Sequence, residues 1–258
     1  MKRSISIILA VGLLALVFAG CGDKKEQPAN ATGDNAKTAL VMGTNAAFEP
    51  FEYRNDQNEV VGFDVDVAKL IADKDGRELK VEDMNFDSLI GALEAERIDM
   101  AIAGMSVTEE RKLSVDFSDP YYTSKQVIVV KKGSDIKSKE DLKNKKVGVQ
   151  GGTTGDEMVT KDASITVNRF KKGVDAAVDV KNGRSDAMVL DEEPSKRIVA
   201  ENSDLEILPE EFDREEYAIA VKKGNSELLK TINETIADMK KDGTYEKLLK
   251  SYFPDNEE

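Results

Sequence analysis

Short apolar runs alternate with segments in which apolar residues recur every three or four positions, from about residue 39 to the end of the chain. The runs predict buried strands, and the spaced segments predict amphipathic helices. The predicted strands are residues 40–43, 99–103, 126–130, 146–150, 186–190 and 216–221. The predicted helices are residues 63–72, 87–96, 174–181, 227–240 and 245–252, with a further helix that begins at Asp156. This alternation is typical of α/β folds with mainly parallel sheets.

Two parts of the chain follow the same pattern. In residues 93–103 and 180–190 a helix ends, an Arg-x-Asp sequence follows, and four or five apolar residues form a strand. One such match is ordinary chemistry between a helix and a strand. Because the matching positions fall in two strand–helix–strand units, they predict an internal repeat and therefore two similar lobes.

The segment from Gly104 to Arg111 carries the most specific chemistry. A predicted strand ends there in a turn of small residues with two hydroxyl groups, followed by an arginine. Backbone N–H groups, Ser106 and Arg111 would meet at one point, and the planar guanidinium suits a carboxylate. The segment therefore predicts a site for a small acid. The alternative is a capped surface helix with Arg111 in water, which is the common position of an arginine.

A second turn, residues 151–155, is rich in glycine and opens a helix. Such a turn presents free N–H groups and the positive end of the helix dipole to an anion. It is not a nucleotide phosphate loop, because no Gly-Lys-Ser/Thr sequence follows. A plain turn between a strand and a helix remains the alternative.

The N-terminus has the pattern of an export signal. Basic residues at positions 2 and 3 precede an apolar run at residues 5–18 and then Ala-Gly-Cys21. Residues 1–20 are therefore expected to be a lipoprotein signal peptide, since the pattern around Cys21 resembles a bacterial lipobox. A fortuitous cysteine at the end of an anchor helix is the alternative. Residues 21–36 lack apolar periodicity and predict a disordered tether with a span of about 20 Å.

Composition excludes several classes of function. The chain has no histidine, and Cys21 is its only cysteine, so histidine bases, thiol nucleophiles and zinc sites are not expected. We expect no metal and no cofactor. Without Lys2 and Arg3 the mature chain keeps 35 of its 37 basic residues against 50 acidic ones, a formal charge of −15. Basic residues do not cluster with aromatic ones, so nucleic acid is not an expected partner.

Several motifs occur together in one order: Pro-Phe-Glu-Tyr at 50–53, Val-Gly-Phe-Asp-Val-Asp-Val-Ala at 61–68, Phe86, the segment from Gly104 to Arg111, and Asp-Phe-Ser-Asp-Pro-Tyr at 116–121. From about residue 39 to residue 254 the chain resembles the polar amino-acid-binding proteins of ABC importers, which are family 3 of the bacterial extracellular solute-binding proteins.

The resemblance implies a periplasmic-binding-protein type II fold, in which two hinge strands join two lobes. Lobe 1 would comprise residues 37–121 and 217–258, and lobe 2 residues 122–216. The ligand would lie in the cleft between them, beyond the carboxyl ends of the strands. We expect a monomer that binds a free amino acid, and no catalytic residues.

The resemblance also assigns roles to residues. Arg111, Ser106 and the backbone of Gly104 would bind the ligand's α-carboxylate, with a further donor from Thr154. Asp191 would pair with the α-ammonium group, although it could instead cap the helix that contains Pro194. Two aromatic residues would enclose the ligand side chain, and four residues would set selectivity: Phe48 and Phe86, and Asn45, Glu49, Gln150 and Leu190.

The identity of the amino acid stays open. Relatives that bind basic amino acids often carry an acid where this chain has Asn45, which favours a polar or neutral ligand such as glutamine. Glu49 and the aromatic faces keep lysine and arginine possible.

The expected function is that of an extracytoplasmic, lipid-anchored receptor that delivers an amino acid to an ABC permease in the cytoplasmic membrane. Two alternatives remain: a secreted enzyme similar to cyclohexadienyl dehydratase, and a sensor lipoprotein with no role in transport.

Overall fold

The computed structural model describes residues 39–254, which belong to one compact unit. The expected signal peptide (1–20), tether (21–36) and lipidation site (Cys21) lie outside the described residues. No helix between residues 39 and 254 is long and apolar enough to cross a membrane.

The first sheet has five strands in the order β4-β1-β5-β12-β6. Strand β1 runs parallel to β4 and β5, whereas β12 runs antiparallel to β5 and β6. The strands are β1 (Ala39–Thr44), β4 (Glu78–Asp83), β5 (Met100–Ala101), β6 (Val115–Phe117) and β12 (Ala220–Lys222).

The second sheet has the order β11-β7-β10-β8-β9. Strand β8 runs parallel to β9 and β10, whereas β7 runs antiparallel to β10 and β11. The strands are β7 (Tyr122–Lys131), β8 (Lys146–Gln150), β9 (Thr166–Phe170), β10 (Ala187–Asp191) and β11 (Leu205–Tyr217). A separate hairpin pairs β2 (Tyr53–Arg54) with β3 (Val60–Val61).

The two sheets are built alike, which confirms two similar lobes. In each, the three parallel strands, numbered by their order in the chain, lie in the spatial order second, first, third. A pair of strands that are antiparallel to each other extends the sheet beyond the third. Both sheets are therefore mixed, because the strands with which the chain crosses into each lobe, β7 and β12, run antiparallel to the parallel set. The expectation of mainly parallel sheets holds for the repeated units alone.

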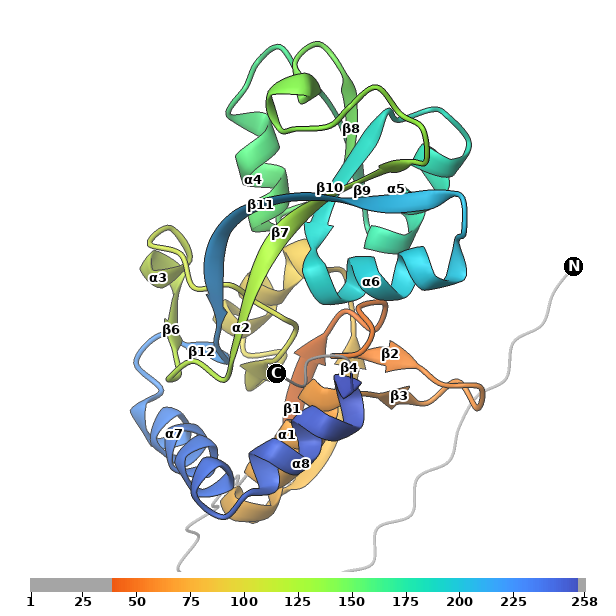
Figure 1. The fold of residues 1–258 in the computed structure, drawn as a ribbon. Helices are drawn as coiled ribbons and strands as arrows, with labels where there is room; N and C mark the ends of the chain where they lie inside the picture. The colour runs from red at the N-terminus through yellow and green to blue at the C-terminus, as the bar shows by residue number, and fades with distance from the viewer. Residues whose placement is uncertain (1–38, 255–258) are drawn as a thin grey trace, which may run out of the picture. The chain divides into compact units, whose positions relative to one another are not determined.

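Two chain crossings join the sheets, as expected. The chain leaves the first sheet after β6 and enters the second at β7, and it returns from β11 to β12. Strands β7 and β11 pair from Leu205 opposite Lys131 to Tyr217 opposite Tyr122, and they run side by side (Figure 1). The predicted strand 216–221 is divided between β11 and β12, because its two ends belong to different sheets.

The helices cover these sheets, and most of them follow the predicted segments closely. They are α1 (Phe63–Asp75), α2 (Leu89–Glu94), α3 (Arg111–Ser114), α4 (Thr154–Thr160), α5 (Gly173–Lys181), α6 (Glu192–Glu201), α7 (Ser226–Lys241) and α8 (Thr244–Tyr252), with short 3-10 turns at Phe86–Ser88 and Glu140–Leu142. Helices α7 and α8 pack on the first lobe through α1.

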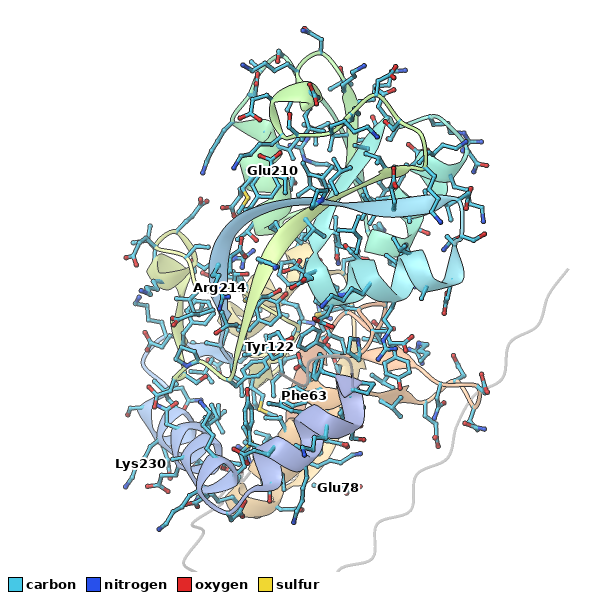
Figure 2. All side chains as sticks on the ribbon, in the orientation of Figure 1. Phe63, Glu78, Tyr122, Glu210, Arg214 and Lys230 are labelled. Atoms are coloured by element: carbon cyan, nitrogen blue, oxygen red, sulfur yellow. The ribbon has the colours of Figure 1, made fainter. Side chains whose placement is uncertain are left out.

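An aromatic cluster lies where the crossing strands meet the first lobe. The centroid of the Phe51 ring lies 4.9 Å from that of the Tyr122 ring and 5.4 Å from that of the Tyr217 ring. Phe63 and Tyr122, labelled in Figure 2, have ring centroids 6.5 Å apart. Phe48 joins the cluster through Phe51 at 5.7 Å. This packing fixes Phe48, which lines the candidate site, and Tyr217, whose hydroxyl donates a hydrogen bond to Asp191 of that site.

Candidate functional site

One cavity is lined from both lobes, at the carboxyl ends of their parallel strands. Its empty space is about 310 Å³, including the part open to solvent. The lining contains nine of the eleven residues that the sequence predicts for ligand binding and selectivity, together with three that it does not: Asn45, Phe48, Phe86, Gly104, Ser106, Arg111, Gln150, Thr154 and Asp191, and then Glu52, Ala103 and Thr153. The structure thus brings together residues that are up to 146 positions apart, from Asn45 to Asp191.

Arg111 is buried at the start of α3, with 6% of its surface exposed. Its Nη1 donates to the carbonyl oxygen of Ser106 at 2.7 Å, and its Nη2 donates to that of Gly152 at 2.9 Å, so it contacts both lobes. The guanidinium carbon lies 5.3 Å from the centre of the Phe86 ring. Burial lowers the pKa of Arg111, but an arginine stays charged at neutral pH. The alternative of a solvated surface arginine is wrong.

Asp191 is the last residue of β10 and is 4% exposed. It occupies the N-cap position of α6, yet its side chain makes no capping hydrogen bond. The carboxylate instead accepts a short hydrogen bond from the hydroxyl of Tyr217. Burial is the main cause that raises the pKa of Asp191 to about 7. The capping alternative is therefore wrong for this side chain.

Ser106 and Thr154 have a protein partner that the sequence did not predict. Both hydroxyl groups donate to the same oxygen of Glu215, Oε2, at 2.5 and 2.7 Å. Thr154 Oγ1 also accepts a hydrogen bond from Gln126 Nε2 at 3.3 Å. In this structure, therefore, the two hydroxyl groups expected to bind a ligand carboxylate donate to a carboxylate of the protein.

Gly104 is positioned by close packing. Its φ is +52°, and an added Cβ would lie 2.6 Å from the ring of Phe48 and 3.2 Å from that of Tyr217. Its N–H donates to Asp64 Oδ2 at 3.0 Å. Only glycine combines this conformation with such close contact.

The four predicted selectivity residues divide into two pairs. Asn45 Oδ1 accepts a hydrogen bond from Gln150 Nε2 at 3.0 Å across the lobes, and Asn45 Nδ2 donates to the carbonyl oxygen of Met84 at 2.7 Å. Glu49 and Leu190 are absent from the cavity lining. The Glu49 Oε1 atom lies 3.9 Å from Arg197 Nε, and the Leu190 side chain lies against Gly173.

Glu52 is a candidate residue that the sequence prediction missed. It lines the cavity with 1% of its surface exposed, and its Oε2 is enclosed without a hydrogen-bond partner. Burial raises the pKa of Glu52 well above its usual value, and nearby Asp64 raises it further. Asp64 accepts hydrogen bonds from Gly104 N and Tyr121 Oη, and burial raises its pKa to about 6. The sequence did contain an indication of this residue, because Glu52 is the acidic residue of the Pro-Phe-Glu-Tyr motif at residues 50–53.

No group of three or more histidine, cysteine, aspartate or glutamate residues that could hold a metal ion occurs within residues 39–254. The cavity lining instead offers one buried cation, two buried carboxyl groups and two aromatic rings, which suit an organic ligand that carries charges of both signs.

Comparison with known proteins gives a consistent result. The model of the bacterial extracellular solute-binding proteins, family 3, matches residues 40–255. The arginine-binding extracellular protein ArtP of Bacillus subtilis (strain 168) is 35% identical, over 96% of this chain and 96% of its own length.

Solved structures agree in fold. The P235GK mutant of ArgBP from T. maritima is 47% identical, with a TM-score of 0.83 over 85% of this chain and 97% of that one. An ancestral arginine-binding protein bound to glutamine is 48% identical, with a TM-score of 0.81 over 84% and 98%. The matched proteins are binding proteins, which leaves the dehydratase alternative without support. From the family match and these relatives, the chain belongs to family 3 of the bacterial extracellular solute-binding proteins.

Proposed function

We propose that this protein is the extracytoplasmic receptor of an ABC importer and binds a free polar amino acid, with L-arginine as the favoured ligand. The observation that carries the proposal is the pair of opposite charges, Arg111 and Asp191, buried in one cavity. Every free amino acid carries a carboxylate and an ammonium group. A buried guanidinium and a buried carboxylate complement these two groups in a site from which water is largely excluded.

Glu52 supports a cationic ligand side chain. Asn45 and Gln150 bond to each other and to the backbone, so their amides are partly satisfied. The enclosed oxygen of Glu52 has no such partner and would pair with a guanidinium or ammonium group. Phe48 and Phe86, which line the same cavity, would add cation–π contacts. The arginine-binding relative from Bacillus subtilis is consistent with this ligand, while the ancestral protein bound to glutamine keeps glutamine as the second candidate.

Binding would favour a closed arrangement of the two lobes. Arg111 comes from the first lobe and Asp191 from the second, so a ligand that contacts both stabilises the closed state and shifts the population toward it. We propose that the lobes comprise residues 37–121 with 217–258, and residues 122–216. The passage of the chain between the sheets near Tyr122 and Tyr217 supports these boundaries. The closed monomer would present its ligand to the permease.

The direct test is calorimetric titration of residues 22–258 with each of the twenty L-amino acids. We expect binding of arginine with one ligand per chain and weaker binding of glutamine. Circular dichroism should show that the sample is folded. A folded sample that binds none of the twenty would refute the proposal.

Glu52→Gln tests the choice of ligand. Removing the carboxylate while keeping the shape of the side chain should weaken arginine binding by about thirtyfold, since a hydrogen bond to a charged group contributes about 2 kcal/mol. The affinity for glutamine should change by less than about threefold, because its neutral amide does not require a carboxylate. Glu49→Gln, outside the cavity lining, is the matched control. Equal losses for both amino acids would contradict the role of Glu52.

Cys21→Ser tests the lipid anchor that we propose for this receptor. A cysteine that carries two or more acyl chains would hold the protein stably at a membrane. The wild-type protein should therefore enter the detergent phase on fractionation with Triton X-114. The serine variant should enter the aqueous phase while binding arginine equally well. Recovery of both proteins in the same phase would contradict lipidation at Cys21.

A further inference from the structure

Glu215 lies near the end of β11, just before the chain returns to the first sheet. At this position it pairs with Ser124 of β7. Its neighbour Arg214, labelled in Figure 2, marks this part of the strand. Glu215 Oε2 accepts hydrogen bonds from Ser106, which follows β5 of the first lobe, and from Thr154, which begins α4 of the second. One side chain of a connecting strand thus bonds to both lobes.

Glu215 stands behind the ligand cavity rather than within it. Ser106 and Thr154 line both the ligand cavity and a wider groove on its outer side. Glu215 lines the groove and is absent from the lining of the cavity. Its second oxygen, Oε1, is enclosed without a hydrogen-bond partner. The three side chains therefore form the wall between the two spaces.

This arrangement determines what the two hydroxyl groups can do. A hydroxyl has one hydrogen and two lone pairs. Since Ser106 and Thr154 each direct their hydrogen to Glu215, their oxygens can only accept hydrogen bonds on the cavity side. Acceptors in that position suit the ligand's ammonium group, beside Asp191. The ligand's carboxylate is left to Arg111 and backbone N–H groups.

We propose that Glu215 is a positioning residue of the amino-acid site: it orients the hydroxyl groups of Ser106 and Thr154 as acceptors and ties together the lobes from which they come. This inference rests on the proposed function. Glu215 acts through the two hydroxyl groups and does not itself touch the ligand.

Calorimetry with L-arginine tests the inference through a double-mutant cycle. Glu215→Ala and Ser106→Ala should each weaken binding roughly tenfold. The double variant should lose little more than either single variant, because both changes remove the same arrangement. Independent contributions would instead give a loss of roughly a hundredfold.

Two conservative variants separate geometry from charge. Glu215→Gln keeps an oxygen in reach of both hydroxyl groups and should bind arginine within about threefold of the wild type. Glu215→Asp keeps the charge but is one methylene too short, and it should lose about as much as Glu215→Ala. These two variants also test the role of Glu215 if the alanine variant does not fold.

The neighbouring Glu216 provides the matched control, because its exposed side chain lines the same groove. Glu216→Gln should bind arginine as the wild type does. The inference is overturned if Glu215→Ala binds normally, if the double variant shows additive losses, or if the aspartate variant binds better than the glutamine variant. If the wild-type protein binds no amino acid, the proposed function fails first and this inference falls with it.

Discussion

Replacing Arg111 by alanine should weaken amino-acid binding by about a thousandfold. The guanidinium is buried, and its loss would leave the ligand's carboxylate in the cavity without a countercharge. Truncating one partner of a buried, hydrogen-bonded charge pair costs about 4 kcal/mol, which corresponds to this factor in Kd. The variant also loses the hydrogen bond to Ser106 within the first lobe and the one to Gly152, which joins the two lobes. Calorimetric titration with L-arginine measures the effect.

Two further variants make the result specific. Arg111→Lys keeps the charge but loses the planar fork, so its affinity should lie between those of the wild type and the alanine variant. Lys112 follows Arg111 in α3, and its exposed side chain forms an ion pair with Glu109. Lys112→Ala should therefore leave amino-acid binding unchanged. If Arg111→Ala bound arginine within about fivefold of the wild type, the carboxylate would have another partner.

The repeated units of the fold were predictable because their central strands are continuous apolar runs. The strand at residues 146–150 matches β8, and the helix at residues 63–72 lies within α1, which ends three residues later. Such strands are buried on both faces, and their composition reflects this directly. The matching order of strands in the two sheets also follows from the repeat that the Arg-x-Asp segments indicate.

The strands at one edge of each sheet were not predicted. Strand β4 reads Glu-Leu-Lys-Val-Glu-Asp, and β9 reads Thr-Val-Asn-Arg-Phe. Each lies at the end of its sheet, where it has a single neighbouring strand and few buried residues. Polar residues on such edges limit pairing with other chains, but they also weaken the apolar pattern. Helix α6, with its two N-terminal glutamates and a proline, was missed for a related reason: only two of its four buried residues, Pro194 and Ile198, are apolar.

The composition of the cavity was predictable, but its hydrogen-bonding network was not. The resemblance assigned eleven residues to the ligand, and nine of them line the same cavity. Glu215 and Ser106 are 109 positions apart, and their contact depends on how β11 pairs with β7 through an irregular register. Glu52 lies in a recognisable motif, yet its exposure depends on how the hairpin and α1 pack around it. A pattern of residue types identifies which side chains reach the cavity, whereas their partners depend on the packed structure.

Amino-acid affinity should rise with pH up to about 7 and then level off. The carboxylate of Asp191 must be ionised to pair with the ligand's ammonium group, but in the ligand-free protein its pKa is about 7, chiefly because it is buried. Binding below this pH therefore expels a proton, and the affinity should fall about tenfold for each pH unit between 7 and 5. The pKa of Glu52 is also raised, so the measurements should be made in the Glu52→Gln variant, in which this second group cannot titrate. Titrations in buffers of different ionisation enthalpy should show release of about one proton per ligand near pH 6.

Asp191→Asn should remove this pH dependence and weaken arginine binding by about a hundredfold at pH 8, since a neutral amide cannot supply the charge. The stability of the ligand-free protein should change with pH in the direction opposite to that of the affinity. A carboxyl group whose pKa is raised by folding binds its proton more tightly in the folded state, so its contribution to stability is present below about pH 4 and is lost as pH rises through 7. Asp191→Asn should therefore make the melting temperature of the ligand-free protein fall less between pH 5 and 8. Affinity of the Glu52→Gln variant that is constant from pH 5 to 7 would place the ligand's ammonium group away from Asp191.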